Sequence, residues 1–290
     1  MSINSKIQSK LEDFLEEEIQ NSSSVSGGCI ADSRVIETTL GKQYFLKMLS
    51  GAAGMFLKEA NSLKELAKPA CIRVPKVILS DEKFLLIEYI QQGIRNDRFF
   101  KDFGADFAQM HRYSSSQFGF FEDNYIGSTP QYNVAQSNEC TNWAEFYFQK
   151  RILAQFKIAE RNNCASDELR KGVHLLENKI DYILAGSEEN PSLLHGDLWS
   201  GNFLCDHNGK AVLIDPAVYY GHREADLAMT KMFGGFSHDF YSSYQQVFPL
   251  ADGWEYREKI YLLYHYLNHL NLFGTSYYST ALSYLWFYLK

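Results

Sequence analysis

Hydrophobic and polar positions follow two different patterns, and the change between them divides the chain near residue 90. Before that point, short apolar runs at strand spacing follow a stretch of helical spacing over residues 1–20. Glycine, proline and acidic turn residues separate these runs. The elements expected in this first part are two short strands within 24–39, a strand over 41–49, a helix over 54–68, and strands over 74–80 and 84–90.

Helical spacing dominates the rest of the chain. Helices are expected within 102–113, 143–162 and 167–184, and aromatic-rich helices close the sequence. The polar segment 91–97 separates the two patterns, so we predict one small lobe over residues 1–90 and a second over residues 91–290. The fold class is therefore α+β, with a sheet-plus-helix first lobe and a mostly helical second lobe.

Composition narrows the possible partners and the compartment. The formal net charge of -7 argues against broad electrostatic binding of nucleic acid. We expect no membrane span, because no apolar run approaches the ~20 residues that one needs. Residues 1–20 lack the apolar core of a signal peptide, so we expect a cytoplasmic protein. The five cysteines are scattered, which fits reduced thiols better than a disulfide framework: Cys29, Cys71, Cys140, Cys164 and Cys205.

The stretch "LLHGDLWSGNF" concentrates polar residues directly after an apolar run. Asp197 and Asn202 have the spacing D-x-x-x-x-N, and Asp215 ends the later run "VLID". In phosphoryl transfer from ATP, one carboxylate accepts the proton of the acceptor hydroxyl, while an amide and a second carboxylate hold Mg²⁺. We therefore interpret Asp197 as the catalytic base and Asn202 and Asp215 as magnesium ligands. The alternative interpretation of these three residues is that they only cap a pair of turns. We interpret His195 as a structural residue that orients the loop.

A kinase also needs a group that holds the ATP phosphates, and the first lobe offers one. Lys47 lies among apolar neighbours in the strand "YFLKML", and Glu59 lies in the following helix. A strand lysine paired with a helix glutamate is the arrangement that binds the α- and β-phosphates. A lysine that merely snorkels to solvent is the alternative. Glu65 is the rival glutamate, but we expect it to be exposed.

Two further segments are candidates for nucleotide contact. The turn formed by Gly27, Gly28 and Cys29 departs from the G-x-G-x-x-G loop of protein kinases, but its backbone N–H groups could approach phosphate. The adenine is expected to bond backbone groups at the lobe boundary, from Glu88, Tyr89 and Ile90. His265 and His269 have metal-ligand spacing without a third ligand, so we predict that they are packing residues.

Several longer phrases resemble the fructosamine kinase (ketosamine-3-kinase) family. The most specific are "LLHGDLWSGN", "IDPAVYYGHREADLAMTKMFGGF" and "YLNHLNLFG", with shorter similarity in "FLK", "FGFFEDNYIGSTPQYN" and "MHRY". The resemblance runs from "SVSGGCI" almost to the C-terminus. It implies a two-lobed, protein-kinase-like fold and phosphorylation of the sugar 3-hydroxyl of ketosamines, which leads to deglycation. Carried over by position, it implies the same roles for Asp197, Asn202, Asp215, Lys47 and Glu59.

The acceptor is expected to be a small-molecule ketosamine or a glycated lysine on a protein, because no long activation segment follows Asp215. Aromatic faces suit sugar C–H groups and amine cations, and the candidates for lining the acceptor site are Trp199, Tyr219, Tyr220 and His222. An aminoglycoside- or choline-type kinase is the nearest alternative, and a non-catalytic nucleotide-binding regulator is a further one. Cys29 is a candidate for a redox-linked dimer, with a buried packing role as the alternative.

Overall fold

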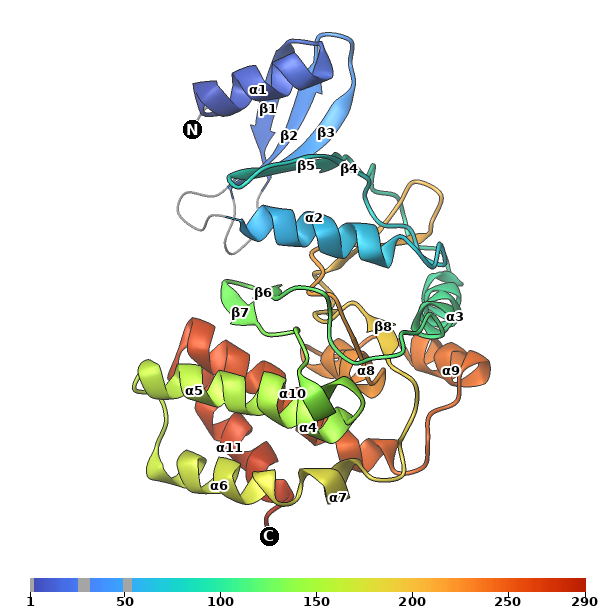
Figure 1. Cartoon of the computed structure of the whole chain (residues 1–290). Helices are drawn as coiled ribbons and strands as arrows, with labels where there is room; N and C mark the ends of the chain where they lie inside the picture. Colours follow the sequence, from blue (N-terminus) through green and yellow to red (C-terminus); the bar gives the residue numbers. More distant parts are fainter. Residues whose placement is uncertain (1–2, 26–31, 49–53) are drawn as a thin grey trace.

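The chain folds into a sheet-based N-terminal lobe and a mostly helical C-terminal lobe, as the sequence pattern predicts (Figure 1). The structure is a computed structural model that describes residues 3–25, 32–48 and 54–290. The predicted division near residue 90 falls between the last strand of the sheet and the first helix of the C-terminal lobe. Among the described residues, no helix combines the length and apolar character required to cross a bilayer.

The N-terminal lobe is a five-stranded antiparallel sheet with one helix on each face. The strand order is β1-β2-β3-β5-β4, and the elements are α1 (Ser5–Leu15), β1 (Ile19–Ser24), β2 (Asp32–Thr38), β3 (Gln43–Met48), α2 (Met55–Leu66), β4 (Val77–Ser80) and β5 (Phe84–Glu88). Side chains alternate across β3, so Leu46 packs towards α1 while Lys47 faces α2. This alternation places the one charged side chain of β3 beside the helix.

The first strand begins earlier than the sequence pattern predicts. We expected helix up to residue 20, but α1 ends at Leu15 and Glu16 adopts a left-handed conformation with φ of 55°. The chain then turns into β1, whose sequence IQNSSS is almost entirely polar. A polar edge strand carries no apolar alternation, and this explains why the pattern did not reveal it.

Short sheets and long helices form the C-terminal lobe. Its strands are β6 (Asn124–Ile126), β7 (Thr129–Gln131), β8 (Ser192–Leu194), β9 (Phe203–Cys205), β10 (Ala211–Leu213) and β11 (Tyr219–Gly221). Its helices are α3 (Phe99–His111), η1 (Ser137–Cys140), α4 (Trp143–Tyr147), η2 (Phe148–Leu153), α5 (Ala154–Arg161), α6 (Asp167–Glu177), α7 (Ile180–Leu184), α8 (Glu224–Lys231), α9 (His238–Val247), α10 (Trp254–Phe273), η3 (Thr275–Tyr277) and α11 (Tyr278–Phe287). The helix predicted over 143–162 contains a π-helical turn at η2, and the helix predicted over 167–184 is divided into α6 and α7.

One apolar core joins the two lobes. It contains Phe56 and Leu63 of α2, Leu85 of β5, and Leu193 and Leu213 from strands of the C-terminal lobe. Figure 1 shows α2 lying between the sheet and the C-terminal lobe, directly above the β6–β7 hairpin. Because α2 packs on both lobes, its position determines how the N-terminal lobe meets the polar loops below it.

Candidate active site

Two short antiparallel strand pairs, β8–β11 and the β9–β10 hairpin, bring together the polar residues of the predicted catalytic loop, residues 195–202. The strand β8 leads directly into His195, and its antiparallel partner is β11. Asn202 precedes β9 and Asp215 lies two residues after β10, so both emerge at the same end of the β9–β10 hairpin. The Ile214 N–H donates to the Asn202 carbonyl at 3.1 Å and extends this pairing. Residues distant in sequence therefore converge because the hairpin register aligns them.

A buried network fixes the start of the catalytic loop. The Asp226 carboxylate accepts the backbone N–H groups of His195 at 2.6 Å and Gly196 at 2.8 Å. Gly196 has φ of 83°, and a Cβ there would lie 2.0 Å from the Ala217 carbonyl oxygen, so only glycine fits. These contacts hold the two residues that precede Asp197.

His195 orients the loop as a neutral ring. It is fully buried, and burial lowers the pKa of its imidazole. Its Nε2 donates to the Ile214 carbonyl at 2.9 Å, and its Nδ1 accepts the Asp197 N–H at 3.3 Å. Both ring nitrogens bond backbone groups, so neither is free to accept a proton from a bound molecule.

Asp197 lies half-buried beside Asn202. Burial, followed by the charge of Asp215, raises the pKa of the Asp197 carboxyl well above its usual range, which brings it closer to that of a base at neutral pH. The Asn202 Nδ2 donates to the Asp197 carbonyl at 2.8 Å and to its carboxylate at 3.2 Å. Because the amide nitrogen makes these bonds, the Asn202 Oδ1 is the atom left for a cation.

Asp215 has an unusual backbone conformation. Its φ of 55° lies in the left-handed region, which non-glycine residues rarely adopt. Local strain of this kind persists only where the surrounding structure enforces it, and it is common at functional sites. The hairpin on one side and Pro216 on the other hold Asp215 in this position.

Lys47 connects the N-terminal lobe to this site. Its Nζ donates to the Glu59 carboxylate at 2.5 Å and also to Asp215. Burial alone would lower the pKa of the Lys47 ammonium, but the charges of Asp215 and Glu59 raise it above its usual value, so the side chain is cationic. Glu65, which we expected to be exposed, is buried and accepts the Tyr220 hydroxyl at 2.9 Å. The expectation was wrong because α2 faces protein on both sides.

A cavity of about 550 Å³ opens above Asp197, Asn202 and Asp215, and Lys47, Glu59 and Trp199 also line it. The Trp199 indole lies against Gly201, where a Cβ would come within 2.4 Å of the ring. The structure thus places one of the four predicted acceptor residues in the same cavity as the catalytic loop. The cavity is large enough for a small molecule.

Sequence reasoning missed most of the cavity wall outside the catalytic loop. The missed residues are aromatic or lie at the tip of the β6–β7 hairpin: Tyr125, Ile126, Gly127, Ser128, Phe233, His269, Phe273 and Tyr277. Phe233 lies 5.3 Å from Trp199 and 5.4 Å from His269 between ring centroids. His269, which we interpreted as a packing residue, packs against Phe233, Phe273 and Tyr277 and also lines the cavity. The described residues contain no cluster of three or more metal-ligating side chains of His, Cys, Asp or Glu.

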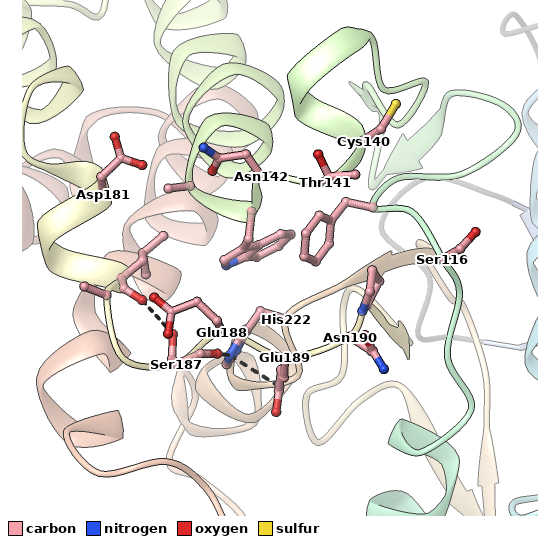
Figure 2. A pocket seen from close by; sticks show the side chains of 16 residues that line it. Ser116, Cys140, Thr141, Asn142, Asp181, Ser187, Glu188, Glu189, Asn190 and His222 are labelled. Carbon is pink, nitrogen blue, oxygen red and sulfur yellow. Dashed lines mark hydrogen bonds and ion pairs between the residues drawn. The ribbon is translucent and has the colours of Figure 1, made fainter.

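The other three predicted acceptor residues lie outside this cavity. Tyr219 is buried under Arg151, whose guanidinium carbon lies 3.9 Å from the ring centroid. Tyr220 reaches α2 through Glu65. His222 lies in a second cavity of about 490 Å³, where it bonds the Ser187 carbonyl at 2.6 Å (Figure 2). Tyr219 and Tyr220 are neighbours in β11 and face different sides of the sheet, and His222 lies beyond the strand, so proximity in sequence to Asp215 did not place the three together.

The structure describes one of the two segments predicted to contact the nucleotide. Gly27, Gly28 and Cys29 lie outside the described residues. Tyr89 and Ile90 follow the last residue of β5, so they are not members of a strand. The Glu88 carboxylate accepts hydrogen bonds from the Arg73 guanidinium at 2.6 Å and from the Lys76 N–H at 3.2 Å. It therefore connects the lobe boundary to the segment that precedes β4.

Comparison with known sequences identifies close relatives along nearly the whole chain. Residues 2–290 match the fructosamine kinase family profile. A chloroplastic protein-ribulosamine 3-kinase from Oryza sativa subsp. indica is 41% identical over 278 residues, which cover 92% of this chain and 78% of the relative. A probable ketoamine kinase from Enterococcus faecium is 38% identical over 258 residues, covering 87% of this chain and 90% of the relative.

Solved structures show the same fold. A Thermobifida fusca protein assigned as a fructosamine-3-kinase superposes with a TM-score of 0.87 at 32% identity, covering 99% of each chain. An aminoglycoside phosphotransferase, APH(4)-Ia, superposes with a TM-score of 0.62 at 15% identity, covering 96% of this chain and 95% of the other. At that low identity the second likeness concerns the fold alone. The predicted two-lobed, kinase-like fold is thereby confirmed.

Proposed function

Because the chain belongs to the fructosamine kinase family and is an ATP-dependent phosphotransferase that acts on a hydroxyl group, we propose that it phosphorylates the sugar 3-hydroxyl of ketosamines. The names of its relatives, ribulosamine 3-kinase and ketoamine kinase, support this acceptor class. The observation that carries the proposal is the shared cavity in which Asp197, Asn202 and Asp215 face an aromatic wall.

Asp197 would accept the proton of the acceptor hydroxyl as the oxygen bonds to the γ-phosphorus of ATP, and ADP would leave with the electron pair of the P–O bond that breaks. Its raised pKa suits this task, because a base works best when its pKa lies near the working pH. The Asn202 amide would orient the carboxylate, and the His195 ring would position the Asp197 backbone, through the contacts described above. Positioning and charge stabilisation then supply most of the rate enhancement, as in other phosphoryl transfers.

Magnesium fits the donor set at the end of the β9–β10 hairpin. Asp215 offers a carboxylate and Asn202 its Oδ1, and hard cations prefer oxygen ligands. When bound there, Mg²⁺ would neutralise negative charge on the phosphates. Asp215→Asn should therefore raise the magnesium concentration at half-maximal activity, whereas Asp197→Asn should not. An unchanged magnesium dependence in Asp215→Asn would remove Asp215 from this role.

The nucleotide would lie between the lobes. Lys47, held by Glu59, would contact the α- and β-phosphates. Backbone groups of Tyr89 and Ile90, next to Glu88, would bond the adenine, and the Gly27–Gly28 turn would cover the phosphates. These contacts remain predictions, and adenine selectivity that survives substitutions of these side chains would agree with recognition through the backbone.

The acceptor would place its sugar hydroxyl at Asp197 and its amine substituent towards the aromatic wall. Trp199 and Phe233 provide faces that suit sugar C–H groups and a cationic amine. Tyr219, Tyr220 and His222 lie outside the cavity, so they would act on the acceptor only indirectly. A small-molecule ketosamine fits the cavity, and a glycated lysine on a protein would have to present its adduct at the exposed rim.

The test is ATP turnover across a panel of acceptors that contains ribulosyl-lysine, fructosyl-lysine, choline and kanamycin, with Asp197→Asn as the control for background hydrolysis. The expected result is turnover with at least one of the two lysine adducts and none with choline or kanamycin. Turnover on choline or kanamycin alone would establish the rival acceptor class on this fold. ATP binding without turnover on any acceptor would favour a non-catalytic regulator.

Two further proposals concern the environment of the protein. We infer a cytoplasmic location, since four cysteines within the described residues are free thiols. Cys29 follows the predicted phosphate-binding turn, and a disulfide to Cys29 of a second chain would link a dimer. Treatment with diamide should inactivate the parent reversibly and spare Cys29→Ser, whereas equal sensitivity of both would remove the redox proposal.

A further inference from the structure

The helix α2 carries Glu59, and two polar contacts anchor it to the C-terminal lobe. The first contact involves Glu122, which precedes β6. Its carboxylate accepts the Lys58 ammonium at 2.5 Å and the Asn61 side-chain amide at 2.8 Å. Glu122 therefore bonds residues on both sides of Glu59.

The second anchor lies one helical turn further along α2. The Glu65 carboxylate accepts the Tyr220 hydroxyl at 2.9 Å, and Tyr220 lies in β11, shortly after Asp215. Burial, followed by the neighbouring Glu65, raises the pKa of the Tyr220 phenol, so the hydroxyl remains a donor. This bond connects α2 to the chain segment that carries the proposed magnesium ligand.

The anchored side chains form one stripe on the helix. Lys58, Asn61 and Glu65 occupy positions i, i+3 and i+7, which lie on the same face of an α-helix. Glu59 lies about 100° further around the axis, where it meets Lys47. The apolar contacts of α2 turn one face of the helix to the core, and the hydrogen bonds of the stripe, which depend on direction, add a more exact restraint on its rotation.

Protein kinases control the same lysine–glutamate pair by moving the glutamate-bearing helix, through phosphorylation of an activation loop. In this chain Asp215 is followed almost at once by β11, which begins at Tyr219. Such a short connection leaves no room for a long regulatory segment. The helix must be held by contacts of another kind.

We propose that Glu122 and Tyr220 are positioning residues that fix the rotation of α2 and so keep the Lys47–Glu59 pair assembled without an activation segment. The inference rests on the proposed role of Lys47 in holding the ATP phosphates. Neither residue lines the cavity of the catalytic loop, so each acts through the helix. Loss of either anchor would let Glu59 turn away from Lys47 and misplace the phosphates.

The test compares Glu122→Ala, Tyr220→Phe and the double variant with the parent. Each single change should lower kcat/KM for ATP about 10-fold, as expected for loss of a hydrogen bond to a charged group. The double variant should lose about 10²-fold. The KM for the acceptor should stay near the parent value, because the aromatic wall is untouched. Tyr220→Phe keeps the ring, so it carries the test if Glu122→Ala does not fold.

Two controls separate positioning from general destabilisation. Glu139→Ala removes the Glu139–Lys150 ion pair, whose glutamate is as enclosed as Glu122 but does not contact α2. Its kcat/KM for ATP should match the parent even if its Tm falls. Lys58 also lines the cavity, so Lys58→Met is measured in both the parent and the Glu122→Ala background. If Lys58→Met lowers kcat/KM for ATP much less in the Glu122→Ala background than in the parent, Lys58 acts through its bond to Glu122.

The proposal is overturned if Glu122→Ala and Tyr220→Phe change Tm but leave kcat/KM for ATP within about twofold of the parent. It is also overturned if Lys58→Met has the same effect in both backgrounds. MgADP affinity is measured for every variant, because it does not depend on the acceptor. If the parent phosphorylates no ketosamine, the proposed function fails, while the MgADP comparison still decides whether the anchors position Lys47.

Discussion

The floor and the wall of the active-site cavity are built differently. The floor contains Asp197 and Asp215, and backbone hydrogen bonds hold these residues in place, Asp215 in a strained conformation. The wall contains Phe233 and Phe273, which are exposed aromatic side chains beyond α8 and at the end of α10. We propose that the floor holds the reacting groups in place, and that the aromatic wall, which suits sugar C–H groups and amine cations, sets the preference for the acceptor.

Removal of the base should produce the largest effect. Asp197→Asn keeps the size of the side chain but cannot accept the hydroxyl proton, so kcat should fall by ~10²–10⁴. ATP affinity should remain close to that of the parent, because Lys47 and Asp215 are unchanged. Steady-state kinetics and direct ATP titration provide the measurement. If Asp197→Asn and Asp215→Asn lose nucleotide binding equally, the division of labour within the floor is wrong.

The pH dependence should show the raised pKa of the same group. Only the ionised Asp197 can act as a base, so kcat/KM should fall as the pH drops through its raised pKa, about 10-fold per pH unit below it. The midpoint of this acid limb should lie well above ~3.9, the ordinary value for aspartate. Circular dichroism at each pH shows whether the protein stays folded. A folded enzyme whose kcat/KM is constant down to the ordinary range would contradict this account of the floor.

Changes in the wall should be smaller and should affect a different constant. Phe233→Ala should raise the KM for the acceptor by about 3- to 10-fold and leave kcat and the KM for ATP nearly unchanged. Phe287→Ala is the matched control, since Phe287 is 43% exposed, Phe233 is 42% exposed, and Phe287 does not line the cavity. A fall in kcat with unchanged acceptor KM would show that the wall takes part in the chemical step.

The same contrast explains what the sequence could predict. Asp197 and Asn202 are close in sequence, and hairpin register brings Asp215 to them, so the spacing D-x-x-x-x-N, with His-Gly before it and Ile-Asp after it, predicted that these residues meet. The pairing of Lys47 with Glu59 followed from strand alternation and helical spacing. Phe233 and Tyr277 carry no such local signal, because their positions depend on how the last helices pack. Tyr220 and Glu65 were misplaced for a related reason: their contact joins two elements that are distant in sequence.

The fate of the phosphorylated product tests the central claim most directly. A ketosamine phosphorylated at the sugar 3-hydroxyl is unstable, so we predict that free amine appears slowly after the enzyme has been removed. Fructosyl-lysine or ribulosyl-lysine is incubated with ATP, the protein is filtered out, and ³¹P NMR and an amine assay follow the product over time. Loss of the sugar phosphate adduct matched by release of lysine is the expected result. A phosphorylated product that keeps its amine indefinitely would contradict the account.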